Sequence, residues 1–315
     1  MVKSTGIHHI TAIVGHPQEN VDFYAEVLGL RMIKKTVNFD DPETYHLYFG
    51  NDKGDPGTAM TFFSWPHAPR GKVGSGQVRV TRFAIPVGAI DFWLERLTRF
   101  GVDVAKETRF DEPYLAFSDP HGLMLELVES DREPLSRYET REVEQSVAIK
   151  GFYGAVLESL APEKTARLLE KVFGLTRIQD DESFMRFQGE GAFGHTIDLI
   201  KRARTQGVMG VGTVHHIAFR NADDKAQGVF RERVMNEGYR VTPVIDRMYF
   251  HSIYFRDFGG ILFEMATDGP GFTVDEPYET LGEALKLPPQ HEHMRPSLNQ
   301  SLIPIDATKH RGELR

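Results

Sequence analysis

The feature that most constrains this chain is an internal repeat. Four stretches share one order of elements: an apolar strand, an amphipathic helix that ends at a glycine, and then strands rich in Phe, Tyr, Leu and Val. They cover residues 6–66, 78–130, 147–202 and 213–268. A repeated unit of this kind buries its apolar faces against its neighbours. The repeat therefore favours a pair of modules that was duplicated once more; the alternative is another α+β fold with regular strand–helix alternation.

The helix of each module has recognisable start and stop signals. Pro17 and Pro162 suit the first turn of a helix, and the helix of the first module is predicted over residues 17–28. Apolar side chains recur at helical spacing, as in Ile90, Trp93 and Leu97. The four helices are expected to stop at glycines: Gly29, Gly101, Gly174 and Gly238.

A charged stretch separates the second module from the third. Residues 129–144 are dense in charge, which is typical of a linker over the surface. We therefore expect an N-terminal domain over residues 1–140 and a C-terminal domain over residues 141–315, each with two modules. Beyond Gly282 the chain turns polar and predicts a tail or an arm along the surface.

Composition excludes several classes of protein. The chain has 315 residues and no Cys, so disulfides, iron–sulfur clusters and thiol nucleophiles are excluded. No apolar stretch approaches the roughly 18 residues of a membrane span, and the first residues lack the apolar core of a signal peptide. The net charge of −8 and the lack of a basic run argue against nucleic acid as a partner. We expect a cytoplasmic protein with no membrane partner; a homo-oligomer is compatible with the sequence, which leaves the oligomeric state open.

Two histidine pairs begin equivalent strands of the repeat. His8-His9 opens the first module and His215-His216 opens the fourth, each followed by Ile. Side chains alternate along a strand, so one His of each pair is expected on each side of the sheet. A single pair would be explained by histidines that cap a strand end. Two pairs at matching positions favour a shared functional site.

A carboxylate lies in an apolar strand of the fourth module. Glu264 stands within Ile-Leu-Phe-Glu-Met-Ala, where a charge is costly unless it is paired or binds a metal. Glu126 occupies the matching place in the second module, which opens with Arg82-Phe-Ala and has no His. Glu126 is either a relic of the duplication or a hydrogen-bond acceptor. The candidate site therefore contains two histidines and one carboxylate.

That ligand count has a chemical meaning. Two neutral imidazoles and one carboxylate on one face of an octahedral ion leave neighbouring positions open, which suits Fe(II) enzymes that bind both substrate and O₂. Mn(II) fits the same ligands. A structural site would instead be closed by four ligands. The sequence thus predicts a catalytic metal.

The ordered set of these motifs resembles the vicinal-oxygen-chelate superfamily. Within it, the segment that begins at Tyr45 (Tyr-His-Leu-Tyr-Phe-Gly), residues 54–63 and residues 246–256 resemble the hydroquinone-type ring-cleaving dioxygenases. The resemblance covers residues 6–270. It implies an α+β fold in which four βαβββ modules are paired into two vicinal-oxygen-chelate domains with curved mixed sheets.

The resemblance also implies the residues of the site. The implied metal ligands are His9, His216 and Glu264. The implied pocket residues are Arg247 and Tyr254, with His215, His8 and Thr11 as catalytic neighbours. Without the resemblance, Arg247 would be interpreted as a surface ion-pair residue and Tyr254 as a packing residue. Because His9 belongs to the first module and the other ligands to the fourth, these two modules are expected to meet.

The resemblance implies a non-haem Fe(II) ring-cleaving dioxygenase of extradiol type. It would act with O₂ on a small aromatic substrate, a hydroquinone or a related phenol, with Arg247 and Tyr254 stabilising oxyanion charge and His215 moving a proton. One alternative is a glyoxalase-like metal-dependent isomerase or lyase on the same fold, which would need a further carboxylate as base; Glu126 is the obvious spare. Another is a metal-free binding module, which would need neither His9 nor Glu264.

Overall fold

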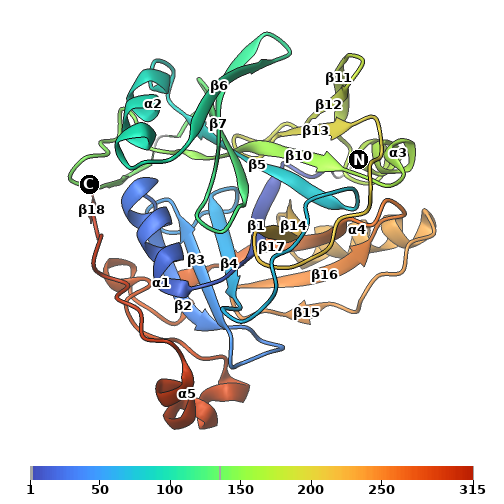
Figure 1. Cartoon of the computed structure of the whole chain (residues 1–315). Coiled ribbons are helices and arrows are strands. Elements are labelled where there is room, and N and C mark those ends of the chain that lie inside the picture. Colours follow the sequence, from blue (N-terminus) through green and yellow to red (C-terminus); the bar gives the residue numbers. More distant parts are fainter. Residues whose placement is uncertain (1–2, 135, 315) are drawn as a thin grey trace.

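The computed structural model describes residues 3–134 and 136–314 and contains two eight-stranded mixed sheets. The sheets lie one above the other in Figure 1, and the helices of the four modules lie at the left and right of the molecule. Each sheet is curved, and the two together form the paired α+β fold that the sequence predicts.

The first sheet combines the first and fourth modules. Its strand order is β15-β16-β17-β14-β1-β4-β3-β2, and antiparallel pairing of β1 with β14 joins the two modules. The expectation that modules one and four meet is therefore confirmed. The strands are β1 (Ile7–Val14), β2 (Arg31–Val37), β3 (Tyr45–Gly50), β4 (Ala59–Ser64), β14 (Thr213–Asn221), β15 (Ile245–Asp246), β16 (Phe250–Arg256) and β17 (Leu262–Pro270).

The second sheet combines the second and third modules in the same way. Its order is β11-β12-β13-β10-β5-β8-β7-β6, and antiparallel pairing of β5 with β10 joins its halves. The strands are β5 (Gln77–Ile85), β6 (Val104–Arg109), β7 (Glu112–Ser118), β8 (Met124–Glu129), β10 (Gly151–Glu158), β11 (Thr176–Asp180), β12 (Phe184–Gln188) and β13 (Thr196–Ile200).

All four predicted helices are present. They are α1 (Pro17–Val21), which continues as the π-helix η1 (Asp22–Val27), α2 (Ile90–Arg99), α3 (Pro162–Lys171) and α4 (Asp224–Asn236). The glycine that follows each helix has a positive φ, from 66° at Gly29 to 87° at Gly238, a conformation that glycine adopts without strain. None of the helices in the described part of the chain has the length and apolar character to cross a membrane.

The C-terminal segment is an arm packed on the first sheet (Figure 1). It contains η2 (Phe272–Val274), η3 (Tyr278–Thr280), η4 (Pro289–Met294), α5 (Arg295–Ser301) and β18 (Glu313–Leu314), which pairs with β9 (Tyr138–Glu139). The buried ammonium of Lys34 on β2 donates to Asp275 and Glu276 at 2.7 Å each. Leu298 and Leu302 are buried. The polar segment beyond residue 282 is therefore anchored along the surface.

Each sheet takes strands from both sides of residue 140, and the division into two domains at that residue stays a prediction. We expect residues 1–140 and 141–315, produced as separate chains in one cell, to co-purify as a folded pair. Neither fragment alone is expected to be soluble, because each would expose the unpaired edges of β1 and β5 or of β10 and β14. Size-exclusion chromatography and circular dichroism of each fragment and of the pair measure this. A fragment that folds alone as a monomer would contradict the expectation.

Candidate metal centre

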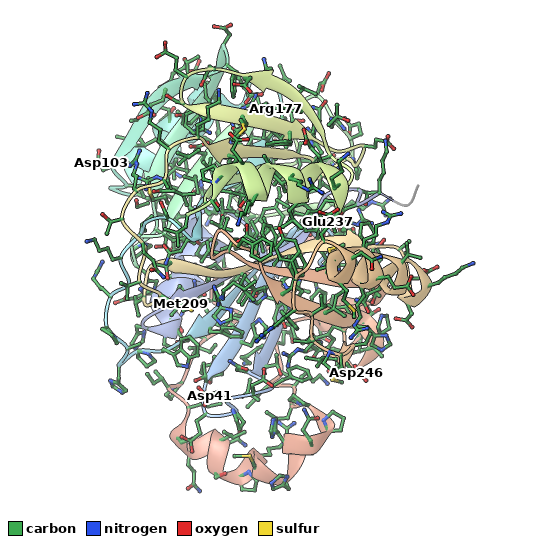
Figure 2. The ribbon with its side chains drawn as sticks, turned by 90° about the vertical axis from the view of Figure 1, so that its right-hand side faces the viewer. Asp41, Asp103, Arg177, Met209, Glu237 and Asp246 are labelled. Carbon is green, nitrogen blue, oxygen red and sulfur yellow. The ribbon has the colours of Figure 1, made fainter. Side chains whose placement is uncertain are left out.

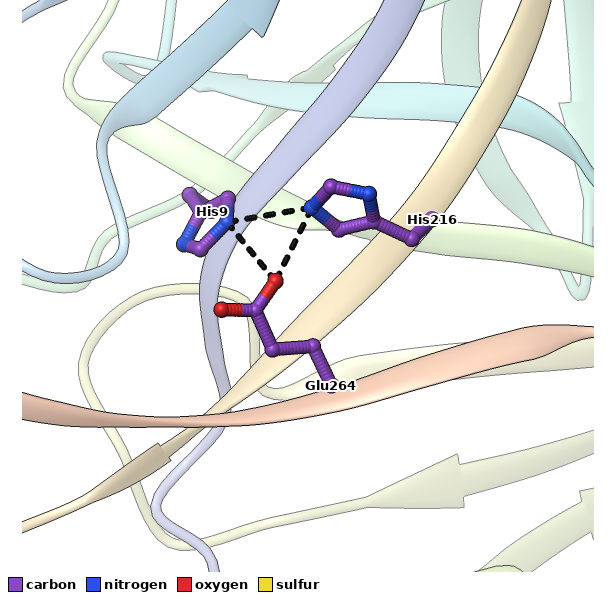
Figure 3. Close-up of side chains that lie close together, drawn as sticks. All are labelled: His9, His216 and Glu264. Carbon is purple, nitrogen blue, oxygen red and sulfur yellow. Dashed lines mark hydrogen bonds and ion pairs between the residues drawn. The ribbon is translucent and has the colours of Figure 1, made fainter. Parts of the chain in front are cut away.

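The predicted ligands meet in the middle of the first sheet. β1, β14 and β17 are adjacent, and their register places His9 and Glu264 on either side of Ala218. His216 lies opposite Thr11. The three side chains therefore come from three neighbouring strands, one of the first module and two of the fourth (Figure 3).

The spacing of the three ligand atoms fits one metal ion. His9 Nε2 lies 3.3 Å from His216 Nε2 and 3.2 Å from Glu264 Oε2, and His216 Nε2 lies 2.9 Å from the same oxygen. Atoms about 2.1 Å from one ion and at right angles to each other would be about 3.0 Å apart. Within the described part of the chain, the buried Glu264 Oε2 receives no hydrogen bond of acceptable geometry. A cation between the three atoms would satisfy it.

A bulge in the β1–β14 ladder positions each ligand histidine. His8 is the extra residue on β1 and His215 the extra residue on β14. Bulges redirect side chains, and here they bring the two rings of each pair into contact in place of strict alternation. His8 Nδ1 lies 2.9 Å from His9 Nδ1, and His215 Nδ1 lies 2.8 Å from His216 Nδ1. Because Nδ1 of each ligand histidine is held by its neighbour, Nε2 is the nitrogen that remains for a metal.

Burial and charge favour the protonation states that bind metals. Burial alone would raise the pKa of Glu264, but the neighbouring His9 and His216 rings outweigh burial and hold this pKa well below its usual range. Burial lowers the pKa of His216, and Glu264 opposes this only in part. A carboxylate and a neutral imidazole are the forms that coordinate a metal.

A cavity of about 310 Å³ opens beside the three ligands. Aromatic side chains form most of its wall, and such walls suit a flat apolar ligand. Its lining residues are His9, Asn38, Phe39, Asp40, Asp41, His46, Tyr48, Phe63, Trp65, His215, His216, Arg247, Phe250 and Tyr254.

Three of the five predicted catalytic residues line this cavity: His215, Arg247 and Tyr254. His8 and Thr11 are not among the described lining residues of this cavity, but each contacts a ligand histidine. His8 contacts His9, and Thr11 Oγ1 lies 2.9 Å from His216 Nε2. The catalytic roles of all five residues stay predictions.

Arg247 and Tyr254 form a polar pair on the cavity wall. Arg247 Nε donates to the Tyr254 hydroxyl oxygen at 3.2 Å. Burial and the charge of Glu264 raise the pKa of Tyr254, so its phenol keeps its proton. Since the arginine already donates to the oxygen, the O–H remains available for a ligand in the cavity.

A chain of hydrogen bonds that the sequence analysis missed leads from the ligands to the opposite wall. Thr11 Oγ1 lies 2.7 Å from Thr61 Oγ1, which lies 2.9 Å from His46 Nε2, and His46 Nδ1 lies 2.9 Å from the Tyr48 hydroxyl. Burial lowers the pKa of His46 well below its usual value, so this ring is neutral. The Tyr-His-Leu-Tyr segment on β3 was the available signal, because alternation places its first His and last Tyr on one face.

In the second sheet, an arginine takes the place that Ala218 has beside Glu264 in the first sheet. Arg82 lies opposite Glu126 in the β5–β8 pair just as Ala218 lies opposite Glu264 in the β14–β17 pair. The fully buried Arg82 guanidinium donates to Glu126 at 2.8 Å and to Asp198 at 3.0 Å. Glu126 therefore accepts hydrogen bonds within an ion pair, which is one of the two interpretations that the sequence left open.

Comparisons with known proteins identify the family of this chain. Residues 6–127 match the family model of the Glyoxalase/Bleomycin resistance protein/Dioxygenase superfamily. The chain is 54% identical over 304 residues to MhqO of Bacillus subtilis (strain 168), named as a candidate ring-cleaving dioxygenase; the match covers 96% of this chain and 97% of that protein. It is 35% identical over 309 residues to the chlorohydroquinone/hydroquinone 1,2-dioxygenase of Sphingobium indicum, with 94% and 95% coverage.

Solved structures show the same fold. The crystal structure of a candidate dioxygenase from Bacillus subtilis superimposes with a TM-score of 0.96 at 53% identity, covering 98% of this chain and 99% of that chain. Glyoxalase I from Zea mays superimposes with a TM-score of 0.61 at 15% identity, covering 84% and 92%. The second likeness concerns the fold alone.

Proposed function

This chain belongs to the hydroquinone-type ring-cleaving dioxygenases of the glyoxalase/bleomycin resistance protein/dioxygenase superfamily, and from that membership we propose that it cleaves hydroquinone-type aromatics with O₂ at a metal held by His9, His216 and Glu264. The observation that carries the proposal is the mutual spacing of 2.9–3.3 Å between the three ligand atoms, beside a cavity lined by aromatic side chains. Fe(II) is the metal we propose, because this ligand set is typical of Fe(II) oxygenases, and Mn(II) fits it as well.

The proposed role of the metal, when bound, is to supply the Lewis acidity and the redox chemistry that ring cleavage needs. The chain supplies binding and orientation. Tyr254 donates its O–H to a ring oxygen, and Arg247 holds Tyr254 in place through its hydrogen bond to the phenol oxygen. His215 is neutral, because burial and the neighbouring His216 lower its pKa to about 3, and its unprotonated ring can accept a hydrogen bond from a substrate hydroxyl at the cavity wall.

The aromatic wall positions the substrate and excludes water. Phe250 packs on His9 with ring centroids 4.9 Å apart, and Phe63 packs on His215 at 5.3 Å. A ring placed between these side chains would lie beside the ligand atoms. This arrangement supports an aromatic substrate of about one ring in a cavity of about 310 Å³.

The rival functions find less support in the same geometry. A glyoxalase-like isomerase or lyase would need a further carboxylate as base, and Glu126 is held by Arg82 and Arg109 in the other sheet. A metal-free binding module would not need three buried ligand atoms converging on one point.

We expect protein reconstituted with Fe(II) without air to consume O₂ when hydroquinone is added. Loss of the aromatic absorbance should match O₂ uptake mole for mole, and catechol tested beside it should react more slowly. An oxygen electrode combined with ultraviolet spectroscopy measures both quantities. Tight metal binding without O₂ uptake on either compound would contradict the proposal and favour the isomerase or lyase.

A further inference from the structure

Arg247 is a cationic side chain in the described cavity wall, and an acid at the entrance already pairs with it. Among the described lining residues, Arg247 is the only Lys or Arg. Its two terminal nitrogens lie 3.0 and 3.3 Å from the two carboxylate oxygens of Asp40, a bidentate contact. The side chain of Arg247 is 17% exposed, whereas that of Asp40 is 75% exposed. The pair therefore spans from the cavity wall to solvent.

The segment that carries Asp40 is held at the entrance by further contacts. It connects β2 to β3. The neighbouring Asp41 accepts from Trp65 Nε1 at 2.9 Å and from the Thr44 hydroxyl at 2.7 Å. His291 of the C-terminal arm lies 2.9 Å from the carbonyl oxygen of Phe39, and Figure 2 shows Asp41 directly above this arm. These contacts fix Asp40 in front of Arg247.

The charges at the entrance disfavour an anionic ligand. Asp40 and Asp41 both line the cavity, and the one guanidinium is already neutralised by Asp40. An anionic ring substituent would meet two carboxylates and would have to displace one of them to reach Arg247. A neutral ring meets no such repulsion, and like charges at close range are unfavourable even near solvent.

We propose that Asp40 is a specificity-determining residue that restricts the cavity to uncharged aromatic rings by neutralising Arg247. Because Asp40 is mostly exposed, its ion pair contributes little to folding stability, and the pair is better explained by its effect on ligands than by its effect on the fold. The inference rests on the proposed function for its ligand class, hydroquinones. The inference adds that a carboxylate on the ring prevents an aromatic compound from binding in the cavity, and that the side chain of Asp40 causes this exclusion.

The test compares hydroquinone with 2,5-dihydroxybenzoate, which is the same ring with one carboxylate. Binding is measured by calorimetry without air on the metal-loaded protein, so that no turnover is needed. We expect the wild-type protein to bind the carboxylate at least about tenfold more weakly than hydroquinone. In Asp40→Asn this ratio should fall about tenfold or invert, because the free guanidinium then attracts the carboxylate. Affinity for hydroquinone should change less than about threefold.

Asp268→Asn is the matched control. Asp268 forms a similar bidentate pair with Arg220 at 2.8 and 2.9 Å, outside the cavity lining. The Asp268→Asn change removes one negative charge, as Asp40→Asn does. It should leave the ratio of the affinities for hydroquinone and 2,5-dihydroxybenzoate unchanged. Equal discrimination in wild type and Asp40→Asn would overturn the proposal, and so would an equal change in both variants.

The test of Asp40 can fail or succeed independently of the test of the proposed dioxygenase function. If hydroquinone binds and Asp40→Asn shifts the ratio, but no O₂ is consumed, then the dioxygenase proposal fails and the role of Asp40 stands. If O₂ is consumed and the ratio does not move, then the role of Asp40 fails alone. Binding of neither compound would overturn both.

Discussion

His9→Ala is expected to lower the affinity for the metal by more than about 100-fold, since changes to residues that merely orient a ligand already cost 10–100-fold. Ring cleavage should fall with metal occupancy. His9 supplies one of three ligand atoms, and it is the one that comes from the first module. Metal content measured after dialysis, together with O₂ uptake at saturating Fe(II), would separate weaker binding from slower chemistry.

His251→Ala is the control for this change. His251 lies on β16 of the same sheet and pairs with Asp224 at the surface, away from the ligand atoms. It should keep the wild-type metal content. Glu264→Gln should behave like His9→Ala, because an amide oxygen is a weaker ligand without charge. Full activity in a folded His9→Ala protein would overturn the assignment of His9 as a ligand. It would also show that the metal site does not need the first module.

Arg82→Met is expected to be the most destabilising single change, by about 3–5 kcal/mol, the range typical when one partner of a buried ion pair is removed. Arg82 is fully buried and donates to Glu126, Asp198 and Glu112. Its loss leaves three carboxylates in the interior of the second sheet with two arginines, Arg109 and Arg186, in place of three. Urea unfolding followed by circular dichroism would show the loss, with a melting temperature roughly 5–10 °C lower.

The effect of Arg82→Met should depend on pH. Burial alone would raise the pKa of Asp198, but the hydrogen bond from Arg186 and the charges of Arg82, Arg186 and Arg109 hold it below its usual range. A carboxyl with a depressed pKa stabilises the fold above its unfolded pKa of about 3.9, and this stability is lost as the pH falls through the folded pKa. The difference between wild type and variant should therefore shrink below about pH 4.

Arg99→Met is the matched control for Arg82→Met. Arg99 pairs with Glu142 at the surface, where both side chains are at least half exposed. An exposed pair typically contributes less than about 1 kcal/mol. A loss of stability in Arg82→Met no larger than in Arg99→Met would show that the buried cluster does not depend on this arginine.

The sequence by itself determined the features that are local. Helix ends depend on glycines with positive φ and on prolines in the first turn, and all four helices lie where these signals predict them. The apolar strand around Glu264 and the His-His-Ile strands identified the candidate ligands, because burial of such polar groups among apolar residues is costly without a partner. The ordered motifs also identified the family.

Only the tertiary structure decided which side chains meet. Pairing of β1 with β14 joins residues about 200 positions apart, and no local pattern sets such a register. The bulges at His8 and His215 depend on that pairing, so strict alternation misjudged both positions. The same holds for the Arg82 cluster and for the contact between Asp40 and Arg247. Side-chain contacts between distant strands are set by packing of the whole sheet, whereas helix ends and apolar patterns are set by neighbours along the chain.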